Sequence, residues 1–133
     1  MTILITTDIR RQLRADGVGR DMHARREWPE PDPCPVVKFF NPLGAATWLA
    51  TELDRDNDTL FGLADLGFGC PELGSFSLFE ISHVRLPYGL RIERDEDFRT
   101  AHPLSLWAET ARRNGSIIGA QAILAANPPP PSN

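Results

Sequence analysis

Carboxylates are concentrated in one stretch of this 133-residue chain, between residues 52 and 65. Four of them stand at alternate positions of the run ELDRDND, which begins at Glu52. Alternate side chains of an extended segment share one side, where like charges repel unless water or a cation separates them. The spacing therefore poses a choice between a solvated turn and a cation site.

The calcium-loop pattern gives this choice a concrete form. Such loops place oxygen ligands at positions 1, 3, 5 and 12 and a glycine at position 6. Asp54, Asp56 and Asp58 would fill the first three positions and Asp65 the twelfth. Thr59 stands where the glycine belongs, and the flanking residues resemble strands rather than helices. We therefore expect a solvated hairpin turn, with a weak Ca²⁺ or Mg²⁺ site formed by these four aspartates as the alternative.

No other combination of residues predicts catalysis. The three histidines are far apart in the sequence and lack the spacing of metal ligands. Ser82 and His83 are neighbours, but adjacent residues on a helix do not face each other. The motifs of nucleophile elbows and phosphate-binding loops are absent, and neither Cys34 nor Cys70 has the sequence context of a reactive thiolate. The sequence leaves enzymatic activity undecided and favours a non-enzymatic protein.

Arginines alternate with carboxylates between residues 85 and 99. A mixed, salt-bridged surface is the ordinary form of such a segment. The alternative is a docking edge at which arginine side chains bind carboxylate or phosphate groups of a partner. In that interpretation Arg85, Arg91 and Arg94 are the candidate partner-binding residues.

The net charge of −4 conceals an uneven distribution. Residues 1–26 carry +3, residues 27–80 carry −8, and residues 81–133 carry +1. The total excludes the strongly basic class of nucleic-acid modules, whose charge attracts phosphate over long range. Weak nucleic-acid binding through arginines and exposed aromatic rings is kept as an alternative, although we expect no nucleic-acid partner.

Composition places the chain among small globular proteins. Its 133 residues and 41% hydrophobic content suit one packed core. No segment approaches the roughly 20 apolar residues of a membrane span, and Met1–Ile5 lacks the basic residues of a signal peptide. Two cysteines are too few for a secreted disulfide scaffold, so we expect reduced thiols and a cytoplasmic location.

Helix and proline signals dominate the first part of the chain. Asp16-Gly17 predicts the end of a helix over residues 7–15, followed by a loop over 17–24. Proline at every second position from 29 to 35 excludes a helix or a central strand. That segment should therefore be a stiff, extended connector.

Short connections in the middle of the chain predict an antiparallel meander of about four strands. The expected strands are rich in β-branched and aromatic residues and cover 36–40, 46–53, 59–65 and 74–76. The first turn should place Phe40 opposite Ala46. The second should place Leu53 opposite Thr59. In this register both faces of the sheet are apolar, so helices at the two ends of the chain are expected to cover them.

Further elements follow the strands. Ser77-Leu-Phe-Glu80 is a capping box, which opens a short helix to about residue 84. Residues 90–94 are a candidate extra strand. Helices are expected over 103–113 and 117–126, before a proline-rich tail.

Together these elements predict the class α+β: an antiparallel β-meander with flanking helices. We expect a single domain over residues 1–126 and a disordered tail over 127–133. The apolar segment 117–126 either closes the core of this domain or forms the contact of a homodimer.

Several strings between residues 36 and 113 are distinctive: VVKFFNP from Val36, LFGLADLG from Leu60, PELG from Pro71 and LRIERD from Leu90. In this core of the chain the sequence resembles a family of small prokaryotic proteins, the domain-of-unknown-function family 2958. The resemblance implies a gene on plasmids and integrative elements, beside transfer and antirestriction genes. It implies no activity and no catalytic residue.

We therefore expect an accessory protein of a mobile genetic element that binds an unidentified protein partner and has no catalytic role. Two alternatives differ from it in class. One is a divalent-metal protein that uses the hairpin 52–65, and the other is a weak nucleic-acid binder.

Overall fold

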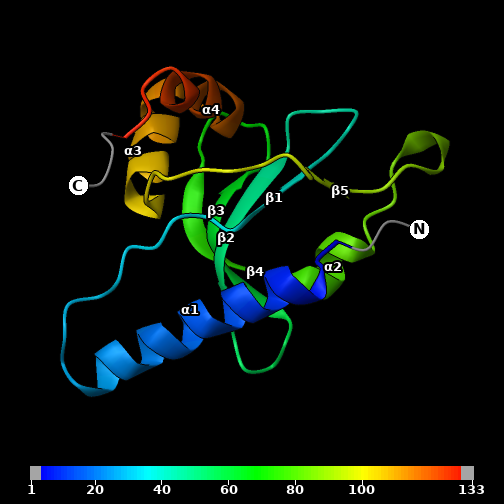
Figure 1. Ribbon diagram of the computed structural model, residues 1–133. Coiled ribbons are helices and arrows are strands. Elements are labelled where there is room, and N and C mark those ends of the chain that lie inside the picture. Colours follow the sequence, from blue (N-terminus) through cyan, green and yellow to red (C-terminus); the bar gives the residue numbers. More distant parts are fainter. Residues whose placement is uncertain (1–3, 130–133) are drawn as a thin grey trace.

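A five-stranded antiparallel sheet separates two groups of helices in the computed structural model, which describes residues 4–129 (Figure 1). The long helix α1 (Thr7–Arg25) packs on one face, and α3 (Leu104–Asn114) with α4 (Ile117–Ala125) packs on the other. The remaining elements are β1 (Val37–Phe40), β2 (Thr47–Leu53), β3 (Thr59–Asp65), β4 (Glu72–Ser77), α2 (Leu78–Ser82), the 3₁₀ turn η1 (Pro87–Gly89) and β5 (Glu93–Arg94). The predicted α+β class is confirmed.

The meander is confirmed as well, with one strand added. The strands lie in the order β4-β3-β2-β1-β5, and every pair is antiparallel. The extra strand expected over residues 90–94 is reduced to two residues, which pair with the end of β1.

The predicted register of the first hairpin is wrong by one residue. Phe40 lies opposite Thr47 rather than Ala46. The reason is that Ala46 is paired with the next residue of the first strand, through a hydrogen bond from Asn41 N to Ala46 O at 2.9 Å. Gly44 N donates to Asn41 O inside the turn at 3.2 Å. Since side chains alternate across a sheet, a shift of one residue moves each β1 side chain to share a face with different β2 side chains.

The second hairpin follows the expected register only in its first half. Leu49 lies opposite Leu63 as predicted, but an irregularity between Ala50 and Glu52 moves Leu53 from Thr59 to Leu60. This β-bulge turns Leu53 into the core under α1, while Leu49 belongs to the core under α3 and α4.

Both sheet faces are apolar and both are covered, as expected. On the α1 side the fully buried residues include Leu13, Val37, Phe39, Ala50 and Leu60. On the other side Leu49 and Leu63 pack against residues of the last two helices, among them Trp107 and Ile117. The apolar segment at the C-terminal end thus closes the core of its own chain.

Helix α1 is ten residues longer than predicted, so the expected helix end at Asp16-Gly17 and the expected loop at 17–24 are wrong. Gly17 is buried where the helix crosses the sheet, and a Cβ there would lie 2.7 Å from Leu53 O. Arg14 Nη1 donates to the same carbonyl at 2.7 Å. The glycine permits a close approach of helix and strand; it does not end the helix.

The proline-rich segment contains neither helix nor strand, as predicted, and it contacts other elements at two places. Pro33 O accepts from Leu104 N at 2.9 Å, at the first residue of α3. Glu30 lies 2.8 Å from a guanidinium nitrogen of Arg20, which also hydrogen-bonds Glu52 on β2. The connector is therefore held against α1, the sheet and α3.

The C-terminal helices lie close to their predicted bounds. Of the tail predicted to be disordered, residues 130–133 lie outside the described part of the chain, and Asn127 Nδ2 donates to Ile123 O at 2.8 Å. Within residues 4–129 no helix is long and apolar enough to cross a bilayer.

Two glycines that lie opposite each other in the sheet allow a matched test of its packing. A Cβ on Gly62 would lie 1.8 Å from Leu49 O, whereas a Cβ on Gly74 would meet nothing within 4 Å. We expect Gly62→Ala to lower the free energy of unfolding by about 3 kcal/mol or more, and Gly74→Ala to change it by about 0.5 kcal/mol at most. Urea unfolding of both variants checks this. Equal effects would contradict the close packing of β2 on β3.

Candidate functional site

The acidic turn between β2 and β3 uses its carboxylates as hydrogen-bond acceptors. Asp56 Oδ1 accepts from the backbone N–H groups of Asp58 at 2.9 Å and Thr59 at 2.8 Å. Its Oδ2 accepts from Thr59 Oγ1 at 2.6 Å. The hydrogen bond from the Thr59 side chain, followed by those from the backbone, lowers the pKa of Asp56. Asp54 Oδ1 accepts from the N–H of Arg55 at 2.7 Å.

Asp58 links this turn to the start of α2. Its Oδ2 accepts from Ser77 Oγ at 2.8 Å, and its Oδ1 accepts from Phe79 N at 2.7 Å. Ser77 in turn accepts from Glu80 N at 3.1 Å, as the predicted capping box requires. Both carboxylate oxygens of Asp58 thus bind donors that begin the helix.

Asp65 lies at the opposite end of β3 and is 1% exposed. Its Oδ1 accepts from Gly67 N and its Oδ2 from Ile117 N, each at 2.9 Å. The strand puts it about 20 Å from the acidic turn, at roughly 3.3 Å per residue. The structure therefore brings three of the four candidate metal ligands into one turn and leaves the fourth apart.

Among the described residues, no three His, Cys, Asp or Glu side chains are placed so that they could hold a metal ion together. The hydrogen bonds give each carboxylate a structural role instead. Asp54 and Asp56 stabilise the turn, and Asp58 caps the start of α2. Asp65 joins the loop after β3 to the start of α4.

The three candidate partner-binding arginines are separated. Arg94 has a side chain only 12% exposed and donates to Leu4 O at 3.1 Å, with Glu96 at 3.7 Å. Arg91 Nη1 donates to Ser82 O at 3.3 Å, and Arg85 is exposed between α2 and η1. Of the three, only Arg91 lines the concave surface beside α2.

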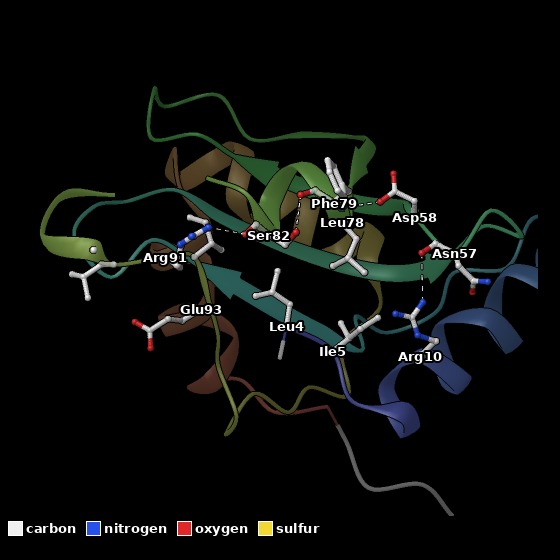
Figure 2. A pocket seen from close by; sticks show the side chains of 13 residues that line it. Leu4, Ile5, Arg10, Asn57, Asp58, Leu78, Phe79, Ser82, Arg91 and Glu93 are labelled. Carbon is white, nitrogen blue, oxygen red and sulfur yellow. Dashed lines mark hydrogen bonds between the residues drawn. The ribbon is translucent and has the colours of Figure 1, made fainter. Parts of the chain in front are cut away.

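That surface is a groove of about 660 Å³ between α2, the residues that precede α1, and the segment 89–93 (Figure 2). We call it the α2 groove. Its apolar lining consists of Leu4, Ile5, Leu78, Phe79, Leu90 and Ile92. Leu4, Ile5 and Ile92 are buried, whereas Phe79 is 63% exposed and Leu90 is 37% exposed. The groove thus has a buried apolar floor and an apolar rim open to solvent.

Arginines lie at two separate places on the groove wall (Figure 2). Arg10 Nη1 donates to Asn57 O at 3.5 Å, and Arg91 binds the Ser82 carbonyl. The groove also contains two carboxylates, Asp58 and Glu93.

Ser82 and His83 are in contact, so the prediction that they do not face each other is wrong. Ser82 Oγ lies 3.0 Å from His83 Nδ1, because α2 ends here and the regular helical geometry with it. However, Ser82 Oγ donates to Phe79 O at 2.7 Å, and His83 Nδ1 lies 2.8 Å from the same carbonyl. A nitrogen that donates to this carbonyl cannot take the serine proton, and no described carboxylate orients the ring. The pair caps the end of α2.

The remaining titratable groups with altered pKa values lie away from the groove. Burial raises the pKa of Glu52, although Arg20 donates a hydrogen bond to it, and that bond raises the pKa of Arg20. Burial likewise raises the pKa of Cys34, which keeps this thiol protonated. Both cysteines are free.

The groove residues were missed by sequence reasoning, apart from Arg91 and Asp58. The capping box located α2, and the adjacent apolar residues Leu78 and Phe79 at its start were the available signal. Nothing in the sequence relates Leu4 or Arg10 to this helix, because the contact arises only from the packing of α1.

We expect Asp65→Asn to lower the free energy of unfolding by about 1–3 kcal/mol, because an amide nitrogen cannot accept from a backbone N–H that is buried. Asp97→Asn, at an exposed position, serves as the matched control and should be close to neutral. Chemical denaturation of the two variants measures the difference. Equal stability of both would contradict the junction at Asp65.

The lowered pKa of Asp56 predicts a pH dependence. Its stabilising effect should be complete above the ordinary pKa of 3.8 and should disappear as the pH falls through the lowered value. The melting temperature of the wild type should therefore exceed that of Asp56→Asn most at neutral pH, and the gap should close in acid. Thr59→Val removes the strongest of the hydrogen bonds and should weaken the trend. A gap that widens in acid would contradict this role.

Comparison with known proteins identifies the family. A family model described as a protein of unknown function, DUF2958, matches residues 4–118. This range includes α1, the proline connector and the start of α4, and so extends beyond the residues 36–113 that carry the resemblance noted above. No curated protein and no solved structure gives a significant match. Because the model covers most of the chain, the protein belongs to the DUF2958 family.

Proposed function

We propose that this chain is a non-catalytic, cytoplasmic protein-binding module, and that the α2 groove holds a short segment of a partner protein. The observation that carries the proposal is the apolar groove itself, which keeps two large side chains on its rim in contact with water. Its volume of about 660 Å³ lies in the range of ligand sites. A contiguous apolar surface of this kind is typical of interaction sites.

The polar groups of the groove favour binding over chemistry. Ser82, Asp58 and Arg91 each donate or accept hydrogen bonds that hold the protein's own backbone or caps. Hydrolysis by a serine needs a nucleophile, a base that takes its proton and an acid that orients the base. These three residues do not form such an arrangement.

The family resemblance supplies a setting for this function. If the gene lies on plasmids and integrative elements, as expected, the partner is a protein of the same mobile element or of its host. The chain would then be an accessory protein that acts by docking.

Selection of peptides from a phage library of random 12-residue sequences tests the proposal. We expect the wild-type chain to enrich a convergent set of peptides. Phe79→Ala should weaken their binding by tenfold or more, because this ring covers the groove rim. Fluorescence polarisation with labelled synthetic peptides measures the dissociation constants.

Phe68→Ala is the matched control, since Phe68 is 82% exposed and does not line the groove. It should leave the dissociation constant unchanged. The absence of convergent peptides, or an equal loss in both variants, would refute the groove as the binding site.

A further inference from the structure

We propose that the partner segment is acidic: apolar side chains enter the α2 groove, and carboxylates beside them bind Arg10 and Arg91. This inference rests on the proposed function and specifies the chemistry of the ligand. It follows from the state of the two guanidinium groups and of the carboxylates near them.

Neither groove arginine forms an ion pair within the described residues. Each has one hydrogen bond to a backbone carbonyl, at 3.5 Å for Arg10 and 3.3 Å for Arg91. A guanidinium carries five N–H donors, so most of its capacity is left for a ligand. Arg20 shows the contrast, because both Glu30 and Glu52 bind it.

The acids of the groove form no ion pair with these arginines within the described residues. Asp58 keeps its negative charge, but its two oxygens accept hydrogen bonds from Ser77 and Phe79, and it forms no ion pair with Arg10 or Arg91. Figure 2 shows the Glu93 carboxylate directed outward, away from Leu4, Ile5 and the groove floor. The guanidinium groups of Arg10 and Arg91 therefore keep N–H donors that a carboxylate of a ligand can bind.

Each of the two arginines has one hydrogen bond to a neighbouring element. The hydrogen bond of Arg10 is to the β2–β3 turn, and that of Arg91 is to the end of α2, so the two guanidinium groups lie at opposite ends of the groove (Figure 2). The planar guanidinium of an arginine matches a carboxylate through two parallel hydrogen bonds. An apolar segment with acidic residues on both sides fits this arrangement.

The experiment uses the peptides selected on the full chain. We expect them to combine apolar residues with aspartate or glutamate. Replacing every acid by its amide should weaken binding to the wild type about tenfold, and Arg10→Gln or Arg91→Gln should weaken binding of the acidic peptide about as much. Arg112→Gln, at an exposed arginine on α3, is the control and should have no effect.

A double-mutant cycle separates charge pairing from loss of fold. The amide peptide should bind Arg10→Gln and Arg91→Gln as well as it binds the wild type, because the pairing is already lost. Melting temperatures of the variants should match that of the wild type.

Three results would overturn the proposal. If the peptides bind through Phe79 but tolerate loss of their acids and of both arginines, the protein-binding function stands and the acidic ligand does not. If no peptides are enriched, both proposals fail. If sedimentation shows a dimer that Phe79→Ala dissociates, a second copy of the chain is the occupant instead.

Discussion

The carboxylate of Asp58 fixes the geometry on which the α2 groove depends. Strand β4 ends at Ser77 and α2 begins at Leu78, so no loop lies between them. Three hydrogen bonds turn the chain here: Asp58 accepts from the Ser77 hydroxyl and the Phe79 N–H, and its carbonyl accepts from Leu78 N at 3.0 Å. They satisfy donors that a helix start leaves without partners. The β2–β3 turn therefore determines the position of α2, which forms one wall of the groove.

Local signals in the sequence predicted the elements that depend on neighbours in the chain. Short turns between β-branched runs indicated the antiparallel meander, and a serine followed by a glutamate three residues later located α2. Such signals are sufficient because a hairpin or a cap is closed by residues only a few positions apart.

Features decided by distant packing could not be predicted in this way. In the sequence, Gly17 resembles a residue that ends a helix. The structure shows that a glycine is needed there because β2 packs against it and leaves no room for a side chain. The bulge after Ala50 has no sequence signature, yet it determines which core receives Leu53. The groove has the same origin, because its walls come from residues 4–10, 57–58, 78–82 and 89–93. The acidic turn shows a further limit. The spacing of its aspartates suggested that their carboxylates converge on a cation, whereas in the structure each carboxylate accepts hydrogen bonds from different donors.

The position of Leu4 and Ile5 has a practical consequence for handling the protein. They belong to the groove, so a tag or fusion joined on the amino-terminal side of Leu4 enters the described chain beside it. Helix α4 and the end of the described chain lie on the opposite side of the molecule from α2 (Figure 1). Affinity handles, fluorophores and surface-attachment points are therefore better placed at the carboxyl end, where they leave the groove open.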